Sequence, residues 1–143
     1  MKNEHVSAVT TDTLHLLTDS TAPFLLKLKK GESLFESLAK CAEILKLPSA
    51  ALSGIGALEN PVLGNFDFEI QKHKPRPFVG IYELTNLTGN ITRDGDRYKV
   101  HIHVTLGLIS DLNCHAITGH LIEADIGIIA EITVTPFAYP IFA

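Results

Sequence analysis

The sequence predicts an α+β fold, a mainly antiparallel β-sheet of about seven or eight strands with one principal α-helix packed on it. Three observations predict this class. Only Ser33–Leu47 has the apolar spacing of an amphipathic helix. Strand-like runs rich in Val, Ile, Thr, Leu and Phe cluster after that helix, separated by Gly, Pro and Asp. No internal repeat, low-complexity segment or linker divides residues 1–143, so a single domain is expected.

Two short strand-like segments precede the helix. Residues 5–17 mix Val, Thr and Leu and are compatible with a strand that ends near 19–21. The apolar run Phe24–Leu28 predicts a second strand, and the Lys-Lys-Gly sequence at 29–31 is typical of a turn.

The helix is predicted over Ser33–Leu47. Ser33 and Glu36 have the spacing of a capping box, in which each side chain accepts a hydrogen bond from a free amide of the first turn. Pro48 is expected to end the helix, because proline has no amide to donate and disfavours a helical predecessor. One broad apolar stripe consists of Leu34, Phe35, Leu38, Cys41, Ala42 and Leu45.

The remainder of the chain is predicted to form strands and turns. Gly54 and Gly56 indicate a β-bulge or a close backbone approach; no third glycine or helix follows to make a dinucleotide-binding loop. A basic loop is expected over Gln71–Pro77, and the Asp94-Gly95 pair predicts a hairpin turn. Strands are expected at 50–53, 62–70, 78–91 (one or two), 98–106, 117–122 and 127–134.

The segment Tyr98–Leu106 alternates between apolar and polar side chains. In a strand, Ile102 and the other aliphatic residues face the core, whereas His101 and His103 face the opposite way. Their Cα atoms lie about 6.5 Å apart along a strand, so both imidazoles can converge on one ion. His120 follows after a short loop and offers a third imidazole. The pattern predicts a metal site at His101, His103 and His120, with zinc as the first choice of metal.

Each candidate residue also has a simpler interpretation. A His-x-His pair on a half-exposed strand needs no ligand, and it is the third histidine that favours a shared site. Glu83 and Glu131 are interpreted as outward-facing residues with ion-pair partners, and the alternative is a carboxylate beside the histidines. His115 is a fourth candidate that we interpret as a surface histidine. Three further histidines lack partners in sequence and are predicted to be solvated: His5, His15 and His73.

The composition limits the classes of function. The net charge of −4, from 16 acidic and 12 basic residues, lacks the basic excess typical of nucleic-acid-binding proteins. Cys41 and Cys114 form neither a zinc-ribbon pattern nor a disulfide framework. No signal-peptide run and no apolar segment of about 18 residues occurs, so a cytoplasmic protein without membrane contact is expected. A hydrophobic fraction of 45% with 20% charged residues favours some apolar surface facing another subunit.

Five short motifs follow one another in the chain: Phe24–Gly31, Ser53–Leu58, Tyr82–Ile91, His101–Gly107 and Gly119–Glu123. In this order they resemble the PPC domain, whose name stands for plants and prokaryotes conserved. The resemblance covers residues 22–135, nearly the whole chain, and it is the series of motifs that makes it specific. It implies an α+β fold and a homotrimer, and prokaryotic members are often described as predicted DNA-binding proteins.

In plant members of this family an AT-hook precedes the domain and binds A·T-rich DNA, while the domain itself supports assembly and partner contacts. The partner-contact segment corresponds to Gly80–Thr85 here. This sequence contains no Arg-Gly-Arg-Pro, so DNA binding is expected to be weak or indirect. Family members tend to have Gly-Gly-His-Leu where this chain has Thr118-Gly119-His120-Leu121, a substitution that leaves the histidine in place.

Three functions therefore stand open. The favoured one is a stand-alone PPC-domain protein, a DNA-binding or regulatory homotrimer that carries the three-histidine metal site and no AT-hook. The alternative is a small zinc-dependent enzyme, a hydrolase or a lyase, in which the same histidines leave a coordination position open. The third is a partner-binding module acting through Gly80–Thr85. Of these, a non-enzymatic role is favoured, and no catalytic residue is assigned.

Overall fold

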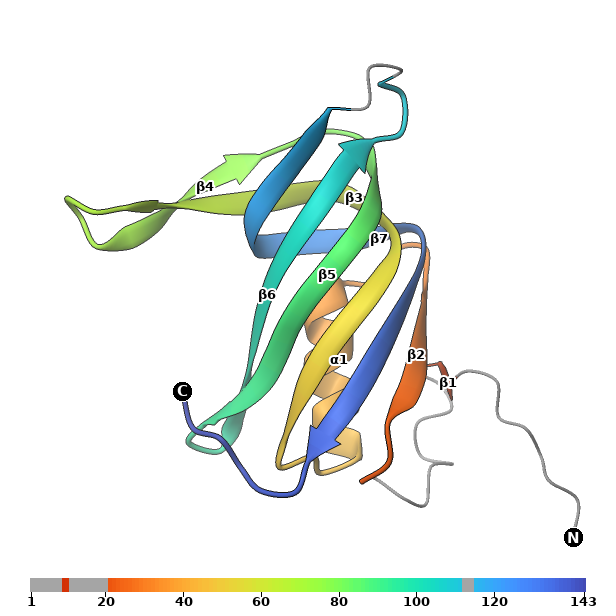
Figure 1. Cartoon of the computed structure of the whole chain (residues 1–143), viewed down its shortest axis with the longest axis vertical. Helices are drawn as coiled ribbons and strands as arrows, with labels where there is room; N and C mark the ends of the chain where they lie inside the picture. Colours follow the sequence, from red (N-terminus) through yellow and green to blue (C-terminus); the bar gives the residue numbers. More distant parts are fainter. Residues whose placement is uncertain (1–8, 11–20, 112–114) are drawn as a thin grey trace, which may run out of the picture.

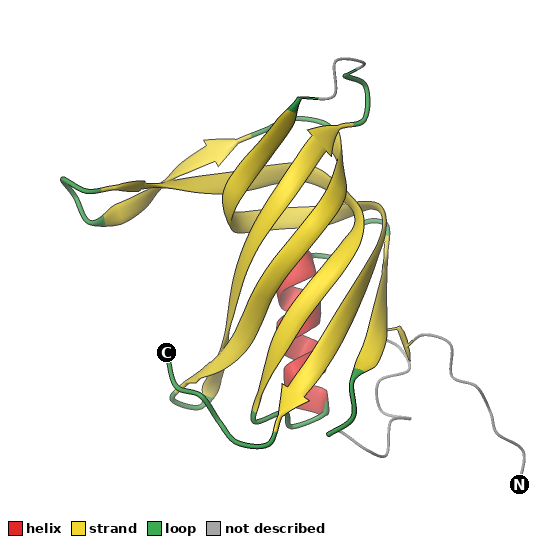
Figure 2. Cartoon of the chain, viewed as in Figure 1, coloured by secondary structure: helices red, strands yellow, loops and turns green. Residues whose placement is uncertain are grey.

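The fold is a β-sheet with one helix against it, which confirms the α+β class (Figures 1 and 2). It is described by a computed structural model over residues 9–10, 21–111 and 115–143. Within these ranges the elements are β1 Val9–Thr10, β2 Phe24–Lys29, α1 Leu34–Ile44, β3 Ser49–Asp67, β4 Lys72–Pro77, β5 Ile81–Asp94, β6 Arg97–Leu108 and β7 Ala116–Phe137.

The described strands form one sheet of seven, in the order β1-β2-β7-β6-β5-β3-β4, with an additional pairing of β7 with β3. Strand β1 pairs with β2 in parallel, and every other pairing among the described strands is antiparallel. Because β7 pairs with β2, β3 and β6, it closes part of the twisted sheet on itself. Figure 1 shows the consequence, since β7 bends sharply and crosses behind β6 and β5 before it turns along β3.

The helix α1 begins at its predicted cap and ends earlier than predicted. Ser33 is the N-cap, and its Oγ accepts a hydrogen bond from the Glu36 amide at 3.4 Å. The expected end at Leu47 is wrong, because the Leu47 amide donates to Ala42 O at 2.9 Å and the Lys46 amide to Glu43 O at 3.1 Å. With Lys46 at φ +50°, these bonds form a Schellman motif that stops the helix before Pro48 can act.

Two pairs of predicted strands are each one long strand. The runs 50–53 and 62–70 both belong to β3, which has 19 residues, and 117–122 and 127–134 belong to β7, which has 22. The predicted breaks are register shifts, which bend a strand without ending its pairing. Gly56 lies at one of these shifts, which agrees with the predicted β-bulge. Its φ is +150°, and a Cβ there would lie 2.3 Å from Ile129 O.

The basic loop expected over Gln71–Pro77 is a strand instead from Lys72 onwards. Residues of β4 pair with the end of β3, from Val62 with Pro77 to Asp67 with Lys72. Two prolines fit this strand because β4 lies at the edge of the sheet, where an amide on the open side needs no partner. The β3–β4 hairpin projects from the body of the sheet (Figure 1).

One face of the sheet is covered by α1, which packs against β6 and β7 (Figure 2). Leu34, Leu38 and Cys41 of the helix are fully buried there. They share one buried cluster with alternate residues of the strands, including Ile102, Val104 and Leu106 of β6. Each fully buried aliphatic side chain of this kind contributes about 1.5–3 kcal/mol of hydrophobic free energy. Within the described ranges no helix is long and apolar enough to cross a membrane.

Candidate metal centre

The two histidines of β6 lie on the face of the strand that turns away from the core. Ile102, which separates them, is fully buried, whereas His101 and His103 are exposed. This is the arrangement that alternation along a strand predicts. The strand keeps this orientation because its apolar face is held against α1.

The third histidine reaches the site through the pairing of β7. His120 lies directly opposite His103 in the antiparallel β6–β7 pair. On its other side, His120 is paired with Gly64 of β3. His120 is therefore in the strand that closes the sheet, and its side chain projects from the same face as His103, because directly opposite residues share a face.

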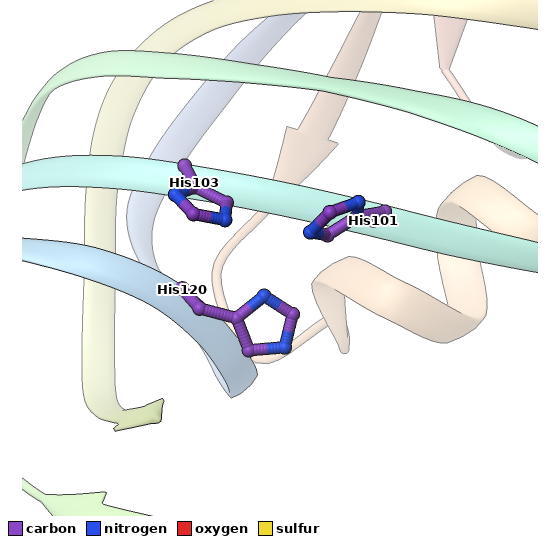
Figure 3. Close-up of side chains that lie close together, drawn as sticks. All are labelled: His101, His103 and His120. Carbon is purple, nitrogen blue, oxygen red and sulfur yellow. The ribbon is translucent and has the colours of Figure 1, made fainter. Parts of the chain in front are cut away.

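The three imidazoles face one another across a small space (Figure 3). Ring centroids are 5.2 Å apart for His101 and His103, 5.1 Å for His101 and His120, and 5.4 Å for His103 and His120. One ring nitrogen from each residue lies within 4.8 Å of those from the other two. The structure thus brings together the three residues that the sequence singled out.

The donor set fits a divalent transition metal such as zinc. Two nitrogens on one tetrahedral zinc, each at about 2.0–2.1 Å from the ion, lie about 3.3 Å from each other, so small rotations of the side chains would close the present spacing. Nδ1 of His120 is buried and has no hydrogen-bond partner among the described residues. In Figure 3 this nitrogen is on the ring edge that faces His101 and His103. A bound cation would satisfy it.

The surroundings keep two of the imidazoles in the neutral form that binds metals. Partial burial lowers the pKa of His101, and the nearby His103, Lys99 and His73 lower it further. The pKa of His120 is also lowered, first by burial and then by the three neighbouring histidines. At neutral pH both rings therefore carry a free lone pair, as a ligand must.

A fourth histidine, His73 on β4, is exposed as predicted, but its ring also lies against the cluster, a contact that the sequence did not predict. Its ring stacks on that of His120, with centroids 4.2 Å apart and planes at 20°. Its opposite neighbour in the hairpin is Phe66, at 5.2 Å and 72°. The sequence analysis missed this contact because it predicted a loop, not a strand, for the segment that contains His73. The two prolines of β4 favoured the loop prediction.

The other candidates lie elsewhere. Among the described residues, the group of side chains that could hold a metal ion consists of the three histidines and does not include Glu83 or Glu131. His115 is exposed, and its Nδ1 lies 3.2 Å from Asp111 Oδ2. Cys41 lies on the buried face of α1, and burial raises the pKa of its thiol to about 12, so it is not a thiolate ligand. Cys114, His5 and His15 lie outside the described residues.

Known structures resemble this chain over most of its length. A plant- and prokaryote-conserved protein from Pyrococcus horikoshii is 32% identical, with a TM-score of 0.75 over 84% of this chain and 82% of its own. A candidate DNA-binding protein from Ralstonia eutropha is 27% identical, with a TM-score of 0.78 over 88% and 85%. A metal-containing protein from Archaeoglobus fulgidus is 25% identical, with a TM-score of 0.73 over 84% and 83%.

No curated protein sequence matches this chain significantly. The model of one family does match it, over residues 18–138. That range includes the helix, the strands β2 to β7 and all three histidines of the cluster. The chain therefore belongs to the family of the Plants and Prokaryotes Conserved (PCC) domain, the PPC domain that the sequence motifs resemble.

Proposed function

We propose that this protein binds one divalent transition metal, preferentially zinc, at His101, His103 and His120, and acts as a non-enzymatic, DNA-associated regulatory homotrimer. The convergence of three imidazoles from two neighbouring strands is the single observation that carries the metal proposal. The unpaired, buried Nδ1 of His120 supports it, because nothing else among the described residues satisfies that atom. The metal-containing relative from Archaeoglobus fulgidus supports it further.

The link to DNA rests on the names of relatives. The Ralstonia eutropha protein is described as a candidate DNA-binding protein. The net charge of −4 opposes strong phosphate binding by this chain. Strand β4 is the most basic of the described strands, and its Lys72 and Arg76 are exposed. Its third basic residue, Lys74, forms an ion pair with Asp67. We therefore propose that DNA contacts by this chain are weak or made through a partner.

The proposed trimer is supported by apolar side chains that the single chain leaves exposed. Ile55, on the sheet face away from α1, is 55% exposed, and Ile128 of β7 is 57% exposed. Ile55 is paired with Glu131, and a shallow hollow lined by Leu25, Thr85 and Thr133 surrounds them. A second copy of the chain would cover these isoleucines and remove their apolar surface from water.

The segment Gly80–Thr85 is proposed as a contact for a protein partner. Gly80 is held in place, since its amide donates to Asn60 Oδ1 at 2.9 Å and its carbonyl accepts from the Asn60 amide at 2.9 Å. Strand β5 begins at the next residue, and its side chains Glu83 and Thr85 are exposed. A fixed backbone with exposed polar side chains supports recognition by another protein.

A second candidate function is that of a zinc-dependent hydrolase or lyase. Three histidine ligands leave a coordination position that structural zinc sites fill with a fourth protein ligand, and His101 and His103 are exposed to solvent. Zinc bound in this way supplies Lewis-acid chemistry for hydrolysis or hydration.

The proposed function is tested on protein purified without an affinity tag, by measuring its metal content and then its binding to duplex DNA in a salt titration. One equivalent of metal and weak, salt-sensitive DNA binding are expected. Absence of stoichiometric metal at pH 7.5 would remove the metal from the proposal. Metal-dependent turnover of ester substrates that His103→Ala abolishes would replace the regulatory role with the enzymatic one.

A further inference from the structure

His73 of β4 and His120 of β7 lie on either side of β3, which pairs with both strands. Strands β6, β7, β3 and β4 run side by side here, because His120 pairs with His103 on one side and with Gly64 on the other, and Gly64 pairs with Pro75. His73 is two residues from Pro75 and therefore projects from the same face. The His73 ring reaches across β3 to stack on His120.

Gly64 is the residue over which this stack is made. A Cβ built on Gly64 would lie 3.0 Å from the Cβ of His73 and 3.2 Å from Cδ2 of His120. It would also lie 3.0 Å from Cδ1 of Ile122. A Cβ at residue 64 would therefore require the side chains of His73, His120 and Ile122 to shift by a few tenths of an ångström. The close approach of β4 and β7 side chains thus depends on a missing side chain in the strand between them.

The stacked geometry excludes His73 as a fourth ligand of the same ion. An ion bound by His120 lies in the plane of the His120 ring, close to its nitrogen. The His73 ring lies 4.2 Å away in a nearly parallel plane, at 20°, so its own lone pairs point along that other plane. The His73 ring instead packs flat against one face of the His120 ring. This contact restricts the orientations that the His120 ring can adopt.

We propose that His73 is a positioning residue of the histidine centre: its stacked ring, admitted by Gly64, holds the His120 ring with Nδ1 turned towards His101 and His103. The β3–β4 hairpin is then part of the site. Phe66 contacts the edge of His73 and Phe68 contacts Phe66, at centroid distances of 5.2 and 5.1 Å. These contacts fix His73 from the hairpin side. The role in metal binding rests on the proposed function, whereas the orientation of the ring does not.

The first measurement uses metal-free protein, so it does not depend on the proposed function. The side-chain NMR signals of His120, whose pKa is lowered, are recorded at pH 8, where this ring is neutral, in wild type, His73→Ala and His73→Phe. His73→Ala removes the stack and is expected to shift the His120 ring signals, because the ring current of His73 is lost. His73→Phe keeps an aromatic face and is expected to restore a ring-current shift. Unchanged His120 signals in His73→Ala would overturn the proposal.

The second measurement is zinc affinity, by competition with a chromogenic chelator. His73→Ala is expected to bind zinc about three- to tenfold more weakly, the size of a lost aromatic contact, and His73→Phe close to wild type. His115→Ala is the matched control, because it removes an exposed histidine that lies outside the cluster. Equal affinity of wild type and His73→Ala would overturn the positioning role. If wild type binds no zinc, the proposed function fails, and the NMR comparison alone decides the orientation of His120.

Gly64→Ala tests the steric part of the proposal. It is expected to displace the stack, to shift the same NMR signals and to weaken zinc binding. Gly107→Ala is its control, because a Cβ at Gly107 meets nothing within 4 Å. Should Gly64→Ala fold poorly in a thermal melt, His73→Ala and His73→Phe, which keep Gly64, decide the positioning role. Retention of the wild-type His120 signals in the folded variant would contradict the role of Gly64.

Discussion

His103 of β6 and His120 of β7 lie directly opposite each other in an antiparallel strand pair, with ring centroids 5.4 Å apart and ring planes at 70°. The pairing of β6 with β7 brings these two residues together, although they are 17 positions apart in the sequence. His101 joins it from the next outward position of β6. The predictions that concern the metal depend on this pair.

Replacing His103 with alanine is expected to weaken metal binding by more than about 100-fold, since even the outer hydrogen-bond partners of metal ligands are worth 10–100-fold. The protein should stay folded, because the His103 side chain is exposed and its neighbours Ile102 and Val104 hold the strand. Chelator competition measures the affinity and a thermal melt measures the fold. His115→Ala should behave as wild type. Unchanged metal retention in His103→Ala would show that the three histidines do not form the site.

Metal affinity is expected to fall on acidification, because protons compete for the imidazole lone pairs. The pKa of His101 and of His120 is lowered by burial, so the fall should begin below the ordinary histidine value of about 6.5. The same shifts affect the metal-free protein. A depressed folded-state pKa gives stability that is present above about 6.5 and is lost as the pH falls through the lowered values. Affinity titrations and melts between pH 8 and 5 measure both, and an affinity independent of pH over that range would contradict this expectation.

Binding of this chain to duplex DNA is expected to be weak and to disappear when salt is raised from 50 to 200 mM. The net charge of −4 allows few phosphate contacts, and such contacts are lost as counterions compete. Fluorescence anisotropy at both salt concentrations checks this. Lys72→Ala should reduce the residual low-salt binding if β4 makes the contacts, whereas Lys40→Ala on the helix is the control. Tight and sequence-selective binding at the higher salt would be the opposite result.

The chain is expected to have about three times its monomer mass of 15.6 kDa in solution. Ile55→Lys should reduce this mass, because it places a charge on the exposed sheet face that we propose as the contact between copies. Ile44→Lys is a matched control, because Ile44 is an exposed isoleucine of α1 and a lysine near a helix C-terminus is well tolerated. Light scattering on the three proteins gives the masses. A wild-type mass of one chain at micromolar concentration would refute the trimer.

Gly56→Ala is expected to destabilise the protein by at least about 2 kcal/mol, since it combines an unfavourable backbone conformation with a clash. The φ of Gly56 is +150°, and a Cβ would lie 2.3 Å from Ile129 O of the neighbouring strand. Gly107→Ala lies in the same sheet with open space around its Cβ and should change stability little. Denaturant unfolding of both variants provides the comparison, and equal stability would mean that the bulge tolerates a side chain.

The local patterns of the sequence by themselves determined the class of fold and the face of each key strand. Alternation along Tyr98–Leu106 correctly turned His101 and His103 away from the core, and Ser33 correctly marked the start of the helix. The Asp94-Gly95 pair correctly marked the turn between β5 and β6. These are properties of neighbouring residues, because side-chain period, capping and turn geometry are set within a few positions of the chain. That the three histidines bind metal stays a prediction.

Only the tertiary structure decided which strands are neighbours. The position of β7 between β6 and β3 places His120 opposite His103, and it depends on pairings between residues far apart in the chain. The stack of His73 on His120 depends in addition on the β3–β4 hairpin and on the absence of a side chain at Gly64. Strand order and register follow from the free energy of burying one face of the whole sheet, and no local run of residues carries that information.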